Sequence, residues 1–120
     1  MGDYKDLIVY QKAYALAMEV FEISKIFPKE ERFSLTDQIR RASRSVCANL
    51  GEAYRKRKYK AHFLLKLSDS ETENTENQIW LDFSNSCKYL SNETYQGLST
   101  KNSEVGKMIW YMMNNPDKFL

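Results

Sequence analysis

The sequence is poor in the residues that interrupt helices, with only four glycines and two prolines among 120 residues. Hydrophobic residues make up 42% and charged residues 28%, a composition that excludes a disordered chain. No stretch approaches the roughly 18 consecutive apolar residues of a membrane span, and residues 1–6 contain no apolar signal segment. We therefore expect one globular, mainly helical domain over residues 1–120, located in the cytoplasm and without a membrane partner.

Cysteine and histidine are too scarce to indicate a metal centre. Cys47 and Cys87 match no CxxC or zinc-knuckle spacing, and both fall in helical patterns where cysteine acts as a small hydrophobic residue. We expect two buried thiols. The one histidine, His62, has no Cys, Asp or Glu at metal-ligand spacing, so we expect it at the surface or its boundary. The sequence predicts no metal site and no cofactor.

Recognisable catalytic motifs are missing as well. The sequence has no glycine-rich phosphate loop, no nucleophile elbow, no Cys–His pair at a recognisable spacing and no paired Glu-x-x-His motifs of a di-iron bundle. Glu73 and Glu76 are neighbours on a helical surface and could be imagined as a general acid and base, but paired surface acids are common. We predict no catalytic residues and a protein that is not an enzyme.

Four segments have the periodicity of amphipathic helices, which we predict over residues 6–27, 35–57, 59–89 and 92–114. The positions that share one helix face in the first, second and fourth segments are Val9, Ala13, Leu16, Val20, Ile23 and Phe27, then Leu35, Ile39, Ala42, Val46, Asn49 and Ala53, and finally Tyr95, Leu98, Asn102, Val105, Ile109 and Met112, and we expect them to form the core. The apolar markers of the third segment are Phe63, Leu67, Ile79, Trp80, Phe83, Cys87 and Leu90. Short connections leave sequential helices as antiparallel neighbours. The pattern predicts an all-α, up-down-up-down four-helix bundle.

The third segment is polar in its middle, because residues 68–78 (SDSETENTENQ) contain no large apolar side chain. A loop could divide the segment there, but glycine and proline are absent, so we favour a continuous polar helix, with local fraying as a third alternative. Two serines precede predicted helices: Ser34, followed by Asp37, and Ser91. We predict that each serine caps the helix after it by binding free backbone amides.

A second apolar stripe runs along the first helical segment beside its predicted core face. It consists of Tyr10, Tyr14, Ala17 and Phe21. Together the two stripes make an apolar arc that is wider than a surface helix of a monomer usually needs. We therefore predict a homo-oligomer in which part of this face meets another subunit.

Positive charge is concentrated between Gln38 and Lys60, although the net charge of the chain is only +2. One acid, Glu52, stands there against the cations Arg40, Arg41, Arg44, Arg55, Lys56, Arg57, Lys58 and Lys60. Cations can neutralise phosphates, and Tyr54 or Tyr59 could stack on an unpaired base, so the segment is a candidate site for RNA or DNA. Alternatively, several arginines pair with Glu52, Glu73 or Glu76, inside the bundle or across a subunit boundary.

Several blocks of the sequence resemble the family of 23S rRNA-intervening-sequence proteins. They are residues 6–13 (DLIVYQKA), Phe27-Pro28 with Glu31, residues 35–42 (LTDQIRRA), Ser45-Val46, residues 49–52 (NLGE), Glu73 with Glu76, and Trp80-Leu81. The likeness covers nearly the whole chain, and residues 38–42 with the Ser-Val and Asn after them are its most specific part. The sequence departs from the family pattern at residues 51–53 (GEA), where Ala-Glu-Gly is more usual, so no special backbone geometry carries over there.

The resemblance implies a left-handed four-helix bundle that often assembles into a homopentamer. Members are encoded in inserts of ribosomal RNA genes or elsewhere on bacterial chromosomes, and a related branch serves diversity-generating retroelements by binding nucleic acid and a reverse transcriptase. Arg40 and Arg41 match the family's paired arginines, and Gln38, Asn49 and Glu52 match polar positions that serve packing, subunit contacts or ligand binding. We therefore expect a non-catalytic oligomeric protein that binds RNA or DNA, the alternative being a structural or protein-interaction bundle.

Overall fold

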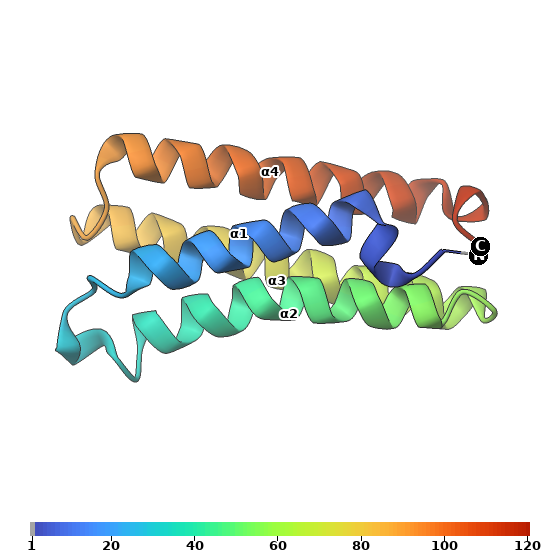
Figure 1. The fold of residues 1–120 in the computed structure, drawn as a ribbon, viewed down its shortest axis with the longest axis horizontal. Coiled ribbons are helices and arrows are strands. Elements are labelled where there is room, and N and C mark those ends of the chain that lie inside the picture. The colour runs from blue at the N-terminus through green and yellow to red at the C-terminus, as the bar shows by residue number, and fades with distance from the viewer. Residues whose placement is uncertain (1) are drawn as a thin grey trace.

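The computed structural model describes residues 2–120 and contains four α-helices, α1 (Ile8–Ser24), α2 (Leu35–Arg55), α3 (Lys60–Ser86) and α4 (Asn92–Asn114). Figure 1 shows that the helices alternate in direction along the chain. Each helix packs against its neighbours in sequence, and α1 also packs against α4. No strand occurs in the described part of the chain. The predicted all-α antiparallel four-helix bundle is confirmed.

α4 has the predicted bounds, whereas α1, α2 and α3 each end two or three residues earlier than the sequence predicts. Three short 3-10 helices lie outside them: η1 (Tyr4–Asp6), η2 (Lys29–Glu31) and η3 (Pro116–Lys118). α1 ends at Ser24 instead of residue 27, ahead of Pro28, which disfavours helical geometry in the residue before it. α3 ends at Ser86 because Lys88 takes a left-handed φ of 65°, which lets the Tyr89 amide donate to the Ser84 carbonyl at 2.9 Å.

α3 is one continuous helix through its polar middle. Ser70, Asn74 and Asn77 are buried there, where large apolar residues are absent. The Ser70 hydroxyl donates to the Val46 carbonyl of α2 at 2.8 Å, and the Asn74 amide donates to the Asn102 side-chain oxygen of α4 at 2.8 Å. Of the alternatives left open by the sequence, the structure has the continuous polar helix, held by hydrogen bonds to both neighbouring helices.

The core between the helices contains most of the predicted positions, whereas Ile23, Asn49, Trp80 and Tyr95 are only half-buried. Of the apolar markers of α3, Ile79 and Phe83 are 42% and 53% exposed and lie on its outer face. Cys87 is also exposed, since it follows the last residue of α3, so only Cys47 fits the prediction of two buried thiols. Within residues 2–120, no helix combines the length and the apolar character needed to cross a membrane.

The two predicted serine caps have different outcomes. The Ser91 hydroxyl oxygen accepts a bond from a backbone amide in the first turn of α4, as predicted. Ser34 does not cap α2; its hydroxyl donates to the Glu31 carboxylate at 2.6 Å, and that carboxylate accepts the Leu35 amide at 3.4 Å. The Tyr89 hydroxyl donates to the same carboxylate at 2.9 Å. The Glu31 carboxylate therefore binds the first amide of α2 in place of the Ser34 side chain, and it ties the α1–α2 connection to the residues after α3.

Candidate nucleic-acid interface

The eight cations of the predicted site fall into two groups on the structure. The helix group, Arg40, Arg41 and Arg44, lies in the first half of α2. The turn group extends from the last residue of α2 through the following turn to the first residue of α3 and consists of Arg55, Lys56, Arg57, Lys58 and Lys60. At 1.5 Å per helical residue, Arg40 and Arg55 are about 22 Å apart along the helix axis. The cations that are close in sequence therefore form two separate surfaces.

Within the helix group, Arg40 joins α2 to α1. Its Nε donates to the Ser24 hydroxyl at 2.8 Å, and its guanidinium lies 4.8 Å from the ring centroid of Phe21. The Arg44 guanidinium is 5.6 Å from the same ring. A cation over an aromatic face is attracted by the ring's negative surface, so both arginines stabilise the α1–α2 contact. Arg41 is exposed.

Within the turn group, two cations are engaged and three are not. The Arg57 guanidinium stacks 3.6 Å from the ring centroid of Tyr54, and its Nε donates to the Tyr54 carbonyl at 2.8 Å. Lys60 pairs with Asp117 at 3.2 Å. The remaining side chains are exposed and make no ion pair with any residue that the structure describes; they are Arg55, Lys56 and Lys58. Within the four residues 55–58, the turn therefore presents three exposed cations without an ion pair or a stacking partner among the described residues.

The two tyrosines of this region differ in accessibility. Tyr54 is covered by Arg57, whereas Tyr59, the residue before α3, is 60% exposed. Its ring meets the edge of the exposed His62 ring, with centroids 6.0 Å apart and an interplanar angle of 74°. The prediction that His62 lies at the surface is thereby confirmed. Tyr59 is the aromatic side chain that remains available beside the turn group.

A pocket of about 680 Å³ lies against the turn group and includes both ends of the described chain. Tyr54, Arg55, Arg57 and Lys58 line it from the turn, and Gly2, Asp3 and Leu120 line it from the ends. Residues so distant in sequence show no common pattern, and for that reason the pocket could not be found from the sequence.

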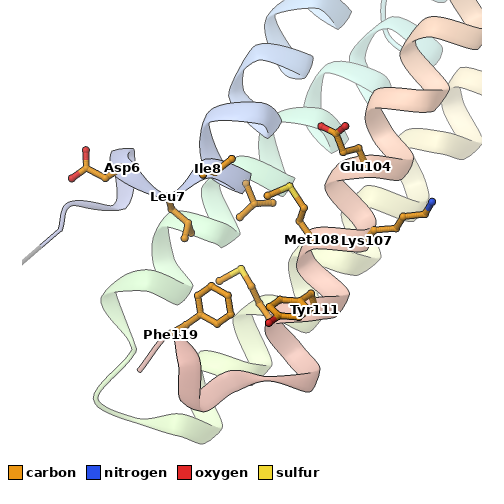
Figure 2. Close-up of a pocket in the computed structure, with 10 residues that line it drawn as sticks. Asp6, Leu7, Ile8, Glu104, Lys107, Met108, Tyr111 and Phe119 are labelled. Carbon is orange, nitrogen blue, oxygen red and sulfur yellow. The ribbon is translucent and has the colours of Figure 1, made fainter.

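A second pocket, of about 580 Å³, lies between the start of α1 and the end of α4. Figure 2 shows Leu7 and Ile8 across from Met108 and Tyr111, with Phe119 below them. Charged residues at its border are Asp6, Glu104 and Lys107. This pocket is mainly apolar and is not lined by either group of cations.

The alternative prediction, that several arginines form ion pairs with Glu52, Glu73 or Glu76 inside the bundle, is wrong for the residues that the structure describes. Glu52 pairs with Lys66 at 2.9 Å, and this hydrogen bond raises the pKa of the Lys66 ammonium. Neither Glu73 nor Glu76 has an ion-pair partner among residues 2–120. The pKa of the Glu73 carboxyl is raised, chiefly by burial and further by Glu76 and Asp69.

Residues 5–111 of the chain match the family described as 23S rRNA-intervening sequence protein. The chain belongs to this family. The resemblance found in the sequence is therefore confirmed, and the matched range includes both groups of cations but not residues 2–4 or 112–120.

A solved relative has the same fold. It is a protein of unknown function from the S23 ribosomal protein family of Bacteroides thetaiotaomicron, with a TM-score of 0.83 and 26% sequence identity. The similarity covers 92% of this chain and 98% of that one. No curated protein matches the chain.

Proposed function

We propose that this member of the 23S rRNA-intervening sequence protein family is a non-catalytic, oligomeric, cytoplasmic protein that binds RNA or DNA through the turn group. The observation that carries the proposal is the set of three exposed, unpaired cations, Arg55, Lys56 and Lys58. When such cations bind the phosphates of a nucleic acid, the counterions condensed on the phosphates are released, and this release drives association at low salt. The proposal includes no catalytic residue, metal or cofactor.

The turn group supports this function better than the helix group does. Arg40 and Arg44 already contact Phe21, whereas Tyr59 adds an exposed ring beside the free cations of the turn. Stacking of a base on an aromatic ring does not depend on base identity. We therefore propose binding that follows the phosphate backbone, with Tyr59 holding an unpaired base. A nucleic-acid enzyme is a further partner that the family resemblance implies.

The test is a titration of fluorescently labelled single-stranded RNA at low salt, followed by anisotropy. Arg55→Glu with Lys58→Glu should abolish binding, because the reversed charges repel phosphates. The matched control is Lys29→Glu with Lys107→Glu, which changes the net charge equally, from +2 to −2, at exposed positions without ion pairs. The control should retain most of the affinity. Absence of binding by the unaltered protein to RNA and to DNA would refute the proposal.

The second candidate function is a structural or protein-interaction bundle whose cations serve subunit contacts. Exposed apolar residues on α1 favour it, since Tyr14 is 55% and Met18 46% exposed on the helix that Arg40 and Arg44 contact. This alternative predicts that Arg55→Glu with Lys58→Glu changes the assembly state in light scattering. Unchanged assembly together with lost RNA binding would argue against it.

A further inference from the structure

Two faces of the bundle carry opposite charges that the chain itself leaves unpaired. Arg41 and Arg44 on α2 form no ion pair within residues 2–120, and neither do Glu73 and Glu76 on α3. The two acids are half-buried and repel each other as like charges, and no cation among residues 2–120 pairs with either of them. Both sets of charges are therefore available to a partner.

Each set of charges lies beside exposed apolar side chains. Tyr14 and Met18 follow the same flank of α1 as Phe21, whose ring Arg44 covers. On α3, Ile79 and Phe83 continue the face of Glu76 at steps of three and four residues. We call Tyr14, Met18, Arg41 and Arg44 the cationic face, and Glu73, Glu76, Ile79 and Phe83 the acidic face. Each face combines charge with apolar area, as subunit contacts do.

The charges of the two faces lie at matching heights along the bundle. The hydrogen bond from Ser70 to the Val46 carbonyl sets the level of α3 against α2. Arg44 lies two residues before Val46, and Glu73 lies three residues after Ser70. Because α2 and α3 are antiparallel, Arg44 is displaced from Val46 toward the same end of the bundle as Glu73 is from Ser70. At 1.5 Å per residue, the two displacements along the helix axis differ by only about 1.5 Å.

The second pair of charges matches in the same way. Arg41 lies five residues before Val46, and Glu76 lies six residues after Ser70. The difference in height is again about 1.5 Å, which is small beside the length of an arginine or glutamate side chain. Rotation about an axis parallel to the helices leaves every height unchanged. Copies related in this way would present Arg44 opposite Glu73 and Arg41 opposite Glu76.

We propose that the partner of the cationic face is the acidic face of a second copy of this chain. The two copies lie side by side with their helices parallel, and each contributes a different face to the contact. The inference rests on the self-association in the proposed function and adds which surfaces carry it. It also gives the helix group a role distinct from that of the turn group. The apolar side chains supply buried area, and the arginine–glutamate pairs set the register and orientation of the copies. Because the two faces differ, the contact can repeat around a ring.

The test reverses the charges of each face and then of both, with sedimentation velocity at micromolar concentration as the measurement and circular dichroism as the check on folding. Arg41→Glu with Arg44→Glu should reduce the assembly to monomers, and so should Glu73→Arg with Glu76→Arg. A chain with all four substitutions should assemble again, because its faces are complementary once more. An equimolar mixture of the two double variants should also form mixed assemblies, which needs no chain with four changes.

Three outcomes would overturn the inference. Double variants that assemble like the unaltered protein would show that the charges do not meet. Folded double variants that stay monomeric both when mixed and when their substitutions are combined would show that the two faces are not partners. An unaltered protein that is a monomer would refute self-association and this contact together. RNA binding is measured separately, in the turn-group variants. A protein that does not bind RNA would therefore refute the proposed function without contradicting the contact between the two faces.

Discussion

The side-chain amide of Asn74 on α3 donates a hydrogen bond to the side-chain oxygen of Asn102 on α4 at 2.8 Å, and the Asn102 amide donates to the Asn74 carbonyl at 3.1 Å. Asn77 donates to the same Asn102 oxygen at 3.0 Å. All three side chains are buried, where water does not replace a missing partner. This cluster connects α3 to α4 at the level where α3 has no large apolar residue.

We expect Asn102→Ala to destabilise the bundle by about 2–4 kcal/mol, because it leaves the buried Asn77 amide without its acceptor and leaves the Asn74 amide only the backbone carbonyl of residue 102. Urea unfolding monitored by circular dichroism measures the change. The control is Gln96→Ala, at an exposed position of the same helix, which should change the free energy of unfolding by less than about 0.5 kcal/mol. Equal effects at the two positions would show that the asparagine cluster does not hold α3 to α4.

Gly106 and Gly97, both in α4, should respond in opposite ways to alanine. A Cβ at Gly106 would lie 2.7 Å from the Asn74 side-chain oxygen, whereas a Cβ at Gly97 would meet no atom within 4 Å. Gly97→Ala should therefore stabilise the protein by about 0.5–1 kcal/mol through helix propensity. Gly106→Ala should destabilise it by about 1–3 kcal/mol, because the buried Asn74 must move. Thermal unfolding compares the two variants, and a stabilising Gly106→Ala would contradict the close approach of α3 and α4.

Tyr89→Phe should lower stability in a pH-dependent way. Hydrogen bonds from Ser34 and then Tyr89 lower the pKa of the Glu31 carboxyl below its ordinary 4.5, and the bond to Glu31 raises the pKa of Tyr89 to about 12. A carboxyl whose pKa is lower in the folded protein contributes stability above its unfolded pKa, and this contribution disappears as the pH falls through the folded value. The variant should therefore have a lower urea midpoint at pH 7.

The same comparison at low pH provides the control. The difference between Tyr89→Phe and the unaltered protein should shrink as the pH falls from 4.5 through the lowered pKa of Glu31 in the folded protein, because the carboxyl then becomes protonated. The substitution keeps the ring that packs on Phe27, with centroids 5.5 Å apart, and removes only the hydroxyl. A difference that is the same at pH 7 and pH 3 would therefore contradict a role of the hydroxyl through the ionised Glu31.

Much of the fold follows from local patterns in the sequence, and the parts that do not have physical reasons. Steps of three and four residues identify the core faces of α1, α2 and α4, because those helices bury apolar side chains. In α3 the pattern misleads, since Asn74 and Asn77 face inward while Ile79 and Phe83 face outward. The spacing of α4 places Asn102 correctly in the core, but which polar residues of α3 are buried depends on partners such as Asn102 on another helix, and the sequence of α3 alone does not reveal them.

The candidate site was predictable in composition but not in arrangement. Charge along the chain identifies all eight cations, yet the length of α2 divides them, and Arg40 lies against Ser24 and Phe21 of α1. Which cations of the turn group are free depends on which of them find a partner in the folded protein, and Lys60, for example, pairs with Asp117. Such pairings join residues far apart in sequence and depend on the packed bundle.

The most direct test of nucleic-acid binding by the turn group is the salt dependence of affinity for single-stranded RNA. Each phosphate contact contributes a slope of about −0.7 to log K against log salt concentration. Lys58→Ala should therefore make the slope less steep by about 0.7, while Lys29→Ala, exposed in η2, should leave it unchanged. An affinity that does not depend on salt, or an equal slope for Lys58→Ala and the unaltered protein, would contradict the account.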